Sequence, residues 1–142
     1  MPKHAAKTKL RADADRFAVG MATRRAVLGD RYVAGREKAK SRFDADFQAF
    51  ITETAWGGLW SRPGLSRRDR SLITIALLAA LGHDEELALH VDATRNTGAT
   101  MDEVKEALLH VAIYGGVPAA NSAFRIAKRA FAEMGAKTGR KA

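Results

Sequence analysis

Cysteine is absent from this chain of 142 residues. Its own residues can therefore form no disulfide, no thiolate metal site and no thiol redox pair. Long apolar runs are also missing, since none approaches the roughly 20 residues of a membrane-spanning helix, and we expect no membrane span. The opening sequence MPKHAAKTKLRADADRF is basic but has no apolar segment of the kind found in secretory signals. These features predict a cytoplasmic location.

Acidic residues are scarce only at the N-terminal end. The formal net charge is +8, and residues 1–42 carry 12 Lys and Arg against 4 Asp and Glu, whereas residues 43–142 carry 12 of each. A basic chain raises the question of nucleic-acid binding. Aromatic residues make up only 7%, however, and do not alternate with the basic residues as a stacking platform requires. We therefore expect no nucleic-acid partner, and flexible basic segments at residues 1–15 and 135–142.

Apolar residues, at 46%, are sufficient for a packed core, and they recur at helical spacing. Strand patterns are almost absent. The pattern predicts helices over residues 13–29, 45–60, 67–82, 84–98, 101–116 and 118–135. The polar segment 30–43 is expected to be a connector. The predicted fold class is all-α, with about six helices in a single domain over residues 16–134.

Short polar residues and glycines mark the expected helix boundaries. The expected N-caps are Asp44, Ser66, Asp84 and Thr100. Asp69 and Glu103 lie three residues after two of these caps and complete patterns that resemble capping boxes. Helix ends are expected at Gly29, Gly57–Gly58, Gly98 and Gly135, and Pro118 is suited to a first turn.

Apolar periodicity also predicts which helix faces are buried. The segment from Leu72 to Leu81 is apolar on every face and is expected to be a buried central helix. The inward positions expected on the other helices are Phe17, Met21, Ala22 and Leu28; Phe47, Phe50, Ile51, Thr54 and Ala55; Val104, Leu108, Val111 and Gly115; and Ala123, Ile126, Ala127 and Ala130.

Two histidines and a glutamate fall on one stripe of the helix predicted after Gly82. In the stretch HDEELALH, His83, Glu86 and His90 are spaced i, i+3 and i+7. Zinc-binding helices of the H-E-x-x-H type place their histidines at i and i+4, whereas these two lie roughly 10 Å apart along the helix axis. We therefore expect no metal site here.

His90 is flanked by apolar Leu87 and Val91, so it is expected to face inward or to line the rim of a pocket. Glu86 lies one turn earlier and is close enough to hydrogen-bond the imidazole, raise its pKa and determine which ring nitrogen carries the proton. Two interpretations stay open. The pair is either a half-buried histidine satisfied for structural reasons or an acid–base pair.

Other polar and aromatic side chains can complete a site. Arg70 and Ser71 lie near the N-terminus of the predicted central helix, where free amides favour an anion, and the guanidinium of Arg70 suits a carboxylate. A surface ion pair is the alternative for Arg70. Tyr114 ends its helix beside two glycines, and Trp60 is a core, interface or pocket-wall residue.

Three stretches of the sequence resemble the carboxymuconolactone decarboxylase family. They are AWGGLWSRPGLSRRDRSLITIALLAAL, EELALHV and GATMDEVKEALLHVAIYGGVPAANSAF. The similarity covers roughly residues 16–134, and its long, ordered set of motifs is specific. The resemblance implies an alkylhydroperoxidase D-like helical fold and a homo-oligomer, commonly a hexamer.

The resemblance also implies a reaction. This is the cofactor-free decarboxylation of 4-carboxymuconolactone, a dicarboxylate lactone, to the β-ketoadipate enol-lactone plus CO2 in the protocatechuate branch of aromatic degradation. For that reaction we expect His90, oriented by Glu86, to donate the proton or to hydrogen-bond the oxyanion. Arg70 and Ser71 are expected to hold a carboxylate, with Tyr114 and Trp60 in the pocket wall.

The wider superfamily includes peroxidases that use a C-x-x-C pair followed by His. Alignment on His90 puts those cysteines at His83 and Glu86, so the peroxidase reaction has no nucleophile in this chain. Two alternatives remain, because one fold can host many functions. They are a related decarboxylase or lactone-binding paralogue with another substrate, and a non-enzymatic helical binding protein with a basic arm.

Overall fold

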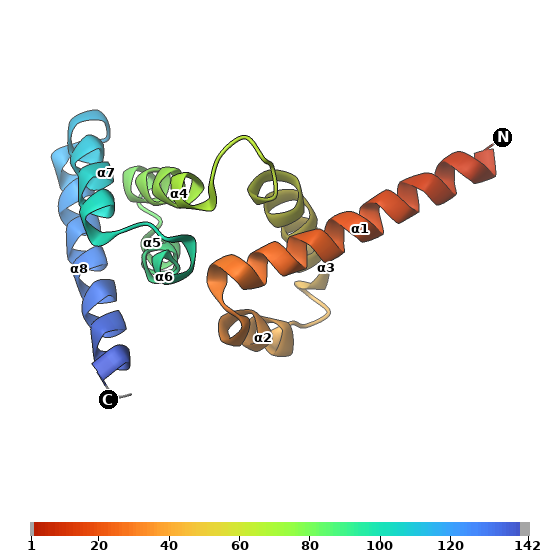
Figure 1. Ribbon diagram of the computed structural model, residues 1–142, viewed down its shortest axis with the longest axis horizontal. Coiled ribbons are helices and arrows are strands. Elements are labelled where there is room, and N and C mark those ends of the chain that lie inside the picture. Colours follow the sequence, from red (N-terminus) through yellow and green to blue (C-terminus); the bar gives the residue numbers. More distant parts are fainter. Residues whose placement is uncertain (1, 140–142) are drawn as a thin grey trace. The chain divides into compact units, whose positions relative to one another are not determined.

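The computed structural model describes the backbone of residues 2–139 and the side chains of residues 15–135, and it contains no strand in that part of the chain. The all-α prediction is therefore confirmed (Figure 1). The elements are α1 (Pro2–Leu28), α2 (Asp30–Ala39), α3 (Ala45–Ile51), the π-helix η1 (Thr52–Trp60), α4 (Arg67–Leu81), α5 (Asp84–Asp92), α6 (Thr94–Thr97), α7 (Met101–Tyr114) and α8 (Val117–Gly139). Because η1 continues α3 and α6 is one turn after α5, the number of separate helical segments is close to expectation.

The chain divides into two compact units, Met1–Leu65 and Ser66–Ala142. The backbone of the basic N-terminal arm belongs to α1, and the backbone of the basic tail belongs to α8 as far as Gly139. The side chains of residues 1–14 and 136–142 lie outside the described residues. None of the helices described is both long enough and apolar enough to cross a bilayer.

In the Met1–Leu65 unit, α1 packs closely on η1. Two glycines permit this contact. A β-carbon at Gly20 would collide with the carbonyl oxygen of Thr52, and one at Gly57 would collide with the carbonyl oxygen of Arg16. The two backbones therefore approach more closely than larger residues would allow. Gly57 is an internal contact residue of η1, so the prediction that Gly57–Gly58 ends the helix was wrong.

This contact also decides which face of η1 is buried. The buried side chains are spaced four residues apart, at Gln48, Thr52, Trp56 and Trp60. The predicted stripe was wrong at Phe47 and Phe50, which are 60% and 63% exposed. The prediction followed the apolar residues, whereas the buried face carries polar Gln48 and Thr52 in line with the two tryptophans. The prediction for residues 30–43 was also wrong, because most of them form α2, with Val33 fully buried.

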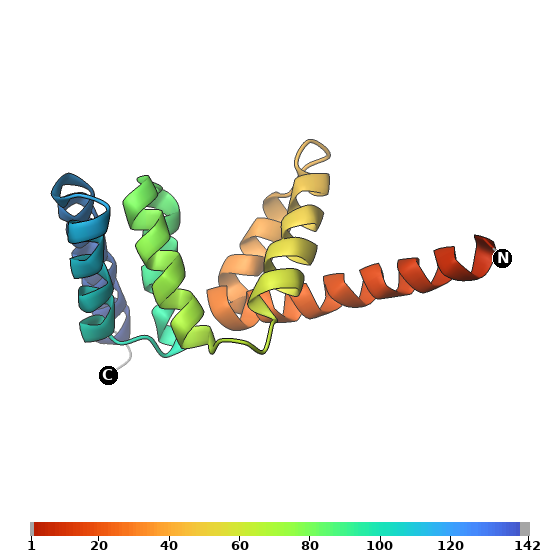
Figure 2. The same ribbon diagram turned by 90° about the horizontal axis from the view of Figure 1, so that it is seen from above.

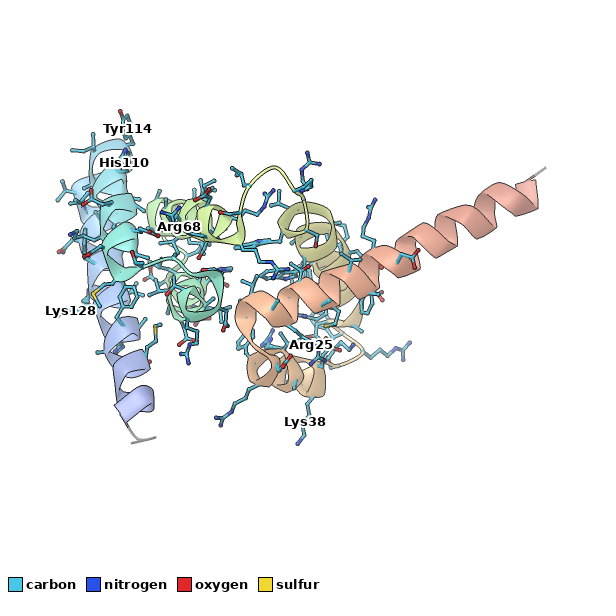
Figure 3. All side chains as sticks on the ribbon, viewed as in Figure 1. Arg25, Lys38, Arg68, His110, Tyr114 and Lys128 are labelled. Carbon is cyan, nitrogen blue, oxygen red and sulfur yellow. The ribbon has the colours of Figure 1, made fainter. Side chains whose placement is uncertain are left out.

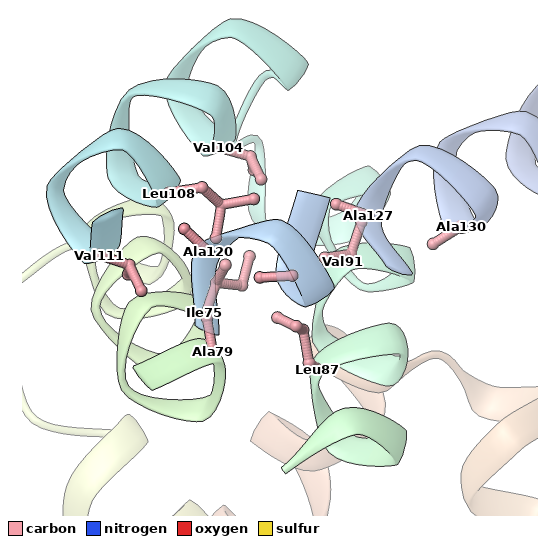
Figure 4. Close-up of a cluster of buried hydrophobic side chains, with 11 residues drawn as sticks. Ile75, Ala79, Leu87, Val91, Val104, Leu108, Val111, Ala120, Ala127 and Ala130 are labelled. Carbon is pink, nitrogen blue, oxygen red and sulfur yellow. The ribbon is translucent and has the colours of Figure 1, made fainter. Parts of the chain in front are cut away.

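In the Ser66–Ala142 unit, α4, α5, α7 and α8 surround one apolar cluster (Figure 4). It contains Val104, Leu108 and Val111 of α7 and Ala123, Ala127 and Ala130 of α8, all as predicted. Helices α7 and α8 lie side by side in both views (Figures 1 and 2). The prediction that α4 is buried on every face was wrong. Ile75 and Ala79 are buried, but Ile73, Leu77 and Leu81 are 48%, 56% and 67% exposed.

Several expected helix boundaries are confirmed. The Ser66 hydroxyl accepts a hydrogen bond from the Asp69 amide at 3.1 Å. Thr100 and Glu103 form a complete capping box, with hydrogen bonds of 3.1 and 3.2 Å. Gly29 and Gly98 follow their helices at φ angles of 91° and 84°, a conformation in which a β-carbon would be strained.

Other expected boundaries were wrong. His83, rather than Asp84, is the residue before α5. The segment 84–98 is divided at Ala93 into α5 and α6. Asp44 precedes α3, but its carboxylate accepts hydrogen bonds from Ser41 instead of capping the helix. Helix α8 continues through Gly135.

The Gly20 contact can be tested by adding one methyl group. We expect Gly20→Ala to lower the free energy of unfolding by about 1–3 kcal/mol, because the methyl group would force α1 and η1 apart. Gly35→Ala, in α2, is the matched control, since a β-carbon there meets nothing within 4 Å. It should be neutral or stabilising by up to ~1 kcal/mol. Urea unfolding of the two variants measures the difference, and equal stability would contradict the close-contact interpretation.

Candidate active site

Helices α4 and α5 form a helical hairpin that carries four of the predicted site residues, Arg70, Ser71, Glu86 and His90. Only Gly82 and His83 connect the two helices, and α4 packs on both α5 and α6. Helices joined by so short a connection are antiparallel neighbours. Arg70 and Ser71 belong to the first turns of α4, and His90 belongs to the last turn of α5. Glu86 lies one turn before His90.

Arg70 and Ser71 are buried although both are polar. Arg70 is 9% exposed and Ser71 is 0% exposed. The Oγ of Ser71 has no hydrogen-bond partner among the side chains that the structure describes. A buried hydroxyl without a partner costs free energy.

His90 is half-buried, and its Nδ1 is shielded from solvent. Burial lowers the pKa of His90 from 6.5 to about 4, although the negative charge of Glu86 acts in the opposite direction. Glu86 does act to raise this pKa, as expected, but the effect of burial is larger and the net shift is downward. Glu86 is exposed, so water screens its charge, and the desolvation of the imidazole is the larger effect. His90 is therefore neutral at pH 7.

The other polar and aromatic residues considered from the sequence differ from these in burial and in neighbours. Tyr114 is 87% exposed at the C-terminal end of α7, where its ring stacks on His110 at 6.3 Å (Figure 3). Trp60 belongs to the Met1–Leu65 unit, where it is buried and stacks on Trp56 with 5.3 Å between ring centroids. His83 is exposed. No three His, Asp or Glu side chains gather as metal ligands among the described residues.

Two grooves are present on the Ser66–Ala142 unit. One, of about 660 Å³, lies between α5 and α8. The other, of about 730 Å³, lies between α7 and α8. Neither is lined by Arg70, Ser71, Glu86, His90 or Tyr114. These five candidate residues are therefore separate from both grooves.

A second buried polar cluster was not anticipated. Arg24 of α1 is 3% exposed and donates a hydrogen bond to the Gln48 side chain at 3.1 Å. Its nearest ion pair is with Glu37 at 3.7 Å, and burial lowers the pKa of the guanidinium. The i+4 spacing between Gly20 and Arg24 was a usable signal. It places the arginine on the face of α1 that approaches η1.

Comparison with known proteins places the candidate residues inside a matched region. A family model described as the carboxymuconolactone decarboxylase family matches residues 45–129. The chain is 46% identical over 123 residues to 4-carboxymuconolactone decarboxylase from Acinetobacter baylyi, a match that covers 87% of this chain and 92% of that protein. It is 38% identical over 118 residues to nitrosuccinic acid decarboxylase npaB from Metarhizium robertsii, covering 83% and 82%. An uncharacterized 15.0 kDa protein from Paracoccus denitrificans is 29% identical over 98 residues, covering 68% and 73%.

The lowered pKa of His90 predicts a pH-dependent stability. Between pH 6.5 and pH 4 the unfolded chain binds a proton at this imidazole and the folded chain does not, so stability should fall as the pH decreases through this window. From pH 7 to pH 5 the loss should be about 2 kcal/mol. His90→Gln should remove most of this loss, whereas His83→Gln, at an exposed position, should retain it. Urea unfolding at both pH values measures the difference, and an equal loss in His90→Gln would refute the assignment.

Proposed function

Because the chain belongs to the carboxymuconolactone decarboxylase family, we propose that it is a carboxy-lyase that converts 4-carboxymuconolactone to the β-ketoadipate enol-lactone and CO2. The observation that carries this proposal is the 46% identity to the Acinetobacter enzyme, which extends over 92% of that protein. A match of this extent does not favour a paralogue with another substrate or a non-enzymatic binding protein.

The reaction requires an electron acceptor, and the substrate supplies one. The departing carboxylate is on the saturated γ-carbon of the lactone, so the C–CO2 bond is adjacent to the ring C=C, which is conjugated with the lactone carbonyl. When the C–CO2 bond breaks, its electron pair moves through the C=C and produces a dienolate with negative charge on the carbonyl oxygen. A proton then adds to the α-carbon. Charge and atoms balance without a cofactor, so the protein needs only to bind an anion, stabilise an oxyanion and supply one proton.

Nitrosuccinic acid, which is named in the second relative, is also a dicarboxylate with an electron-accepting group. The two names therefore share a chemistry. In each, a dianion loses CO2 and the remaining electrons move into a polar acceptor. A site for this class needs a cation for the carboxylate that stays and a hydrogen-bond donor for the acceptor.

In this proposal Arg70 and Ser71 bind a substrate carboxylate. A guanidinium donates two parallel hydrogen bonds to a carboxylate, and Arg70 is buried, so water screens its charge weakly. The Ser71 hydroxyl is fully buried and lacks a partner among the described side chains. A substrate oxygen would satisfy it. These properties suit a site whose polar groups are completed by an anionic ligand.

His90 has two roles in the proposal. Neutral imidazole donates one N–H, which can hydrogen-bond the developing oxyanion, and Glu86 favours the tautomer and orientation required. Binding of a dianion would favour the protonated imidazole and raise its pKa from about 4. His90 can then pass a proton from solvent to the α-carbon. The pocket-wall roles expected of Tyr114 and Trp60 stay predictions.

The proposal also covers the oligomeric state of the protein and its location in the cell. We propose a homo-oligomer, specifically a hexamer. Single helices of each unit leave large apolar side chains exposed, including Phe43 at 98%, Ile113 at 78% and Val117 at 69%, and such residues are typical of association surfaces. A cytoplasmic location agrees with a role in the breakdown of small aromatic compounds.

The first test replaces the proposed oxyanion donor. We expect His90→Ala to lower kcat about 10²–10³-fold, because a preorganised donor at an oxyanion contributes roughly 3–4 kcal/mol. Loss of the lactone absorbance and release of CO2 measure turnover with freshly prepared 4-carboxymuconolactone. His83→Ala is the control and should retain wild-type kcat. A folded His90→Ala protein with wild-type kcat would remove His90 from the chemistry, and a wild-type chain without turnover would refute the proposed reaction.

The second test replaces the proposed carboxylate ligand. Arg70→Ala should raise KM about 10–100-fold, since a hydrogen bond to a charged group is worth roughly 1.5–3 kcal/mol. Arg70→Lys keeps the charge but loses the planar fork and should have an intermediate KM. Arg67→Ala, at an exposed position on the same helix, should change KM less than about 2-fold. An unchanged KM in a folded Arg70→Ala variant would exclude Arg70 from substrate binding.

A further inference from the structure

The Met1–Leu65 unit exposes an aromatic stripe made of Phe43, Phe47 and Phe50. These side chains are 98%, 60% and 63% exposed. Phe47 and Phe50 are three residues apart and share one side of α3, and Phe43 lies in the turn that precedes this helix. Phenylalanine is rarely left so accessible without a reason. The buried side of the same helix uses other residues, such as Gln48 and Thr52, so packing within the unit does not account for the stripe.

Acidic side chains surround the aromatic stripe. Asp44 and Asp46 lie between Phe43 and Phe47, and Glu53 follows Phe50 by three residues. Hydrogen bonds from Ser41 lower the pKa of Asp44, so it stays charged at neutral pH. Arg42 directly precedes Phe43, but no basic residue occurs from Phe43 to Trp60. The aromatic stripe, called the ridge below, therefore has a mainly negative border in a chain whose net charge is +8.

The α7–α8 groove of the Ser66–Ala142 unit has the opposite character. Its floor contains buried Leu108 and half-buried Phe124 and Phe131, which are continuous with the apolar core of that unit. Its cationic residues are Lys105, Arg125 and Lys128, and Asp102 is the single acidic residue that lines it. Lys128 lies on α8 at the edge of the unit (Figure 3).

The cationic border of the groove is only partly neutralised. Lys105 forms an ion pair with Asp102 at 3.5 Å, and both side chains are largely exposed, so the pair is weak. Within the described side chains, Arg125 and Lys128 have no carboxylate within the 4.0 Å of an ion pair. An incoming ridge with a negative border would therefore meet free positive charge beside an apolar floor.

We propose that the aromatic stripe of one copy docks into the α7–α8 groove of a second copy. This inference rests on the proposed homo-oligomer and names the two surfaces that would form it. An amphipathic helix presenting anchors at i, i+4 and i+7 to an apolar groove is a recurring mode of recognition. The ridge and the groove match in apolar character and are opposite in charge.

The size of the stripe fits an assembly contact. Three phenylalanines with these exposed fractions contribute roughly 400–500 Å² of apolar surface, about half of the ~800 Å² per partner found in specific interfaces. Polar and charged neighbours would supply the rest. Since ridge and groove are different surfaces, the contact is head-to-tail, and each copy offers one of each. Repetition of such a contact gives a closed ring when the rotation between copies closes.

Complementary variants test the pairing. The stripe variant carries Phe47→Asp and Phe50→Asp, the groove variant carries Lys105→Glu and Lys128→Glu, and Lys38→Glu, on exposed α2, is the charge control. Sedimentation velocity measures assembly, and far-UV circular dichroism verifies that each variant is folded. We expect each variant alone to be monomeric, with self-association weakened at least about 100-fold, and Lys38→Glu to assemble as wild type. An equimolar mixture should form a heterodimer, because it retains one intact ridge and one intact groove.

The outcomes separate this inference from the proposals that it rests on. A wild-type chain that is monomeric at every concentration would overturn both the oligomer and the docking. A wild-type oligomer with either variant still assembling normally would overturn the docking alone, as would folded variants whose mixture forms no heterodimer. A groove that instead binds a small aromatic anion would give the normal assembly of the groove variant. Turnover of the lactone by the wild-type chain is measured separately and does not depend on these results.

Discussion

The proposed site depends on the burial of one imidazole, that of His90 in the last turn of α5. Arg70 and Ser71 are buried in the first turns of α4, and His90 lies in the last turn of α5. Burial then keeps His90 neutral at pH 7, while the exposed Glu86 affects it weakly. The proposed site combines a buried cation, a buried hydroxyl and a neutral imidazole. The protein supplies this environment, and in the proposed reaction the substrate supplies its own electron acceptor.

The two units have interiors of different composition. The Ser66–Ala142 unit has an apolar core of aliphatic side chains and alanines. The Met1–Leu65 unit buries Thr23, Arg24, Gln48 and Thr52 beside its tryptophans, and it relies on two glycines for close helix contact. A polar interior is stable only when its groups are hydrogen-bonded, and Thr23 meets this condition through Ser61 at 2.8 Å. The same unit leaves Phe43, Phe47 and Phe50 exposed.

The sequence predicted the fold class, the inner faces of α7 and α8 and the caps at Ser66 and Thr100, because 3.6-residue periodicity and local hydrogen bonds determine them. Predictions from the sequence were wrong where tertiary contacts override the local pattern. Gly57 looked like a helix end but permits a close approach, and α4 looked buried on every face although Ile73, Leu77 and Leu81 are exposed. The candidate site was predicted only in part. Spacing placed Glu86 one turn before His90, but the direction of the His90 pKa shift depends on burial, which one sequence does not reveal.

The stacked pair in η1 has a spectroscopic consequence. Trp56 and Trp60 are the only tryptophans in the chain, and both are buried in the Met1–Leu65 unit with 5.3 Å between their rings. Intrinsic tryptophan emission therefore reports on one half of the molecule, while helical ellipticity reports on both. Melting curves recorded by the two signals would coincide only if the halves lose structure together, so the native chain already carries a probe of cooperativity that requires no label.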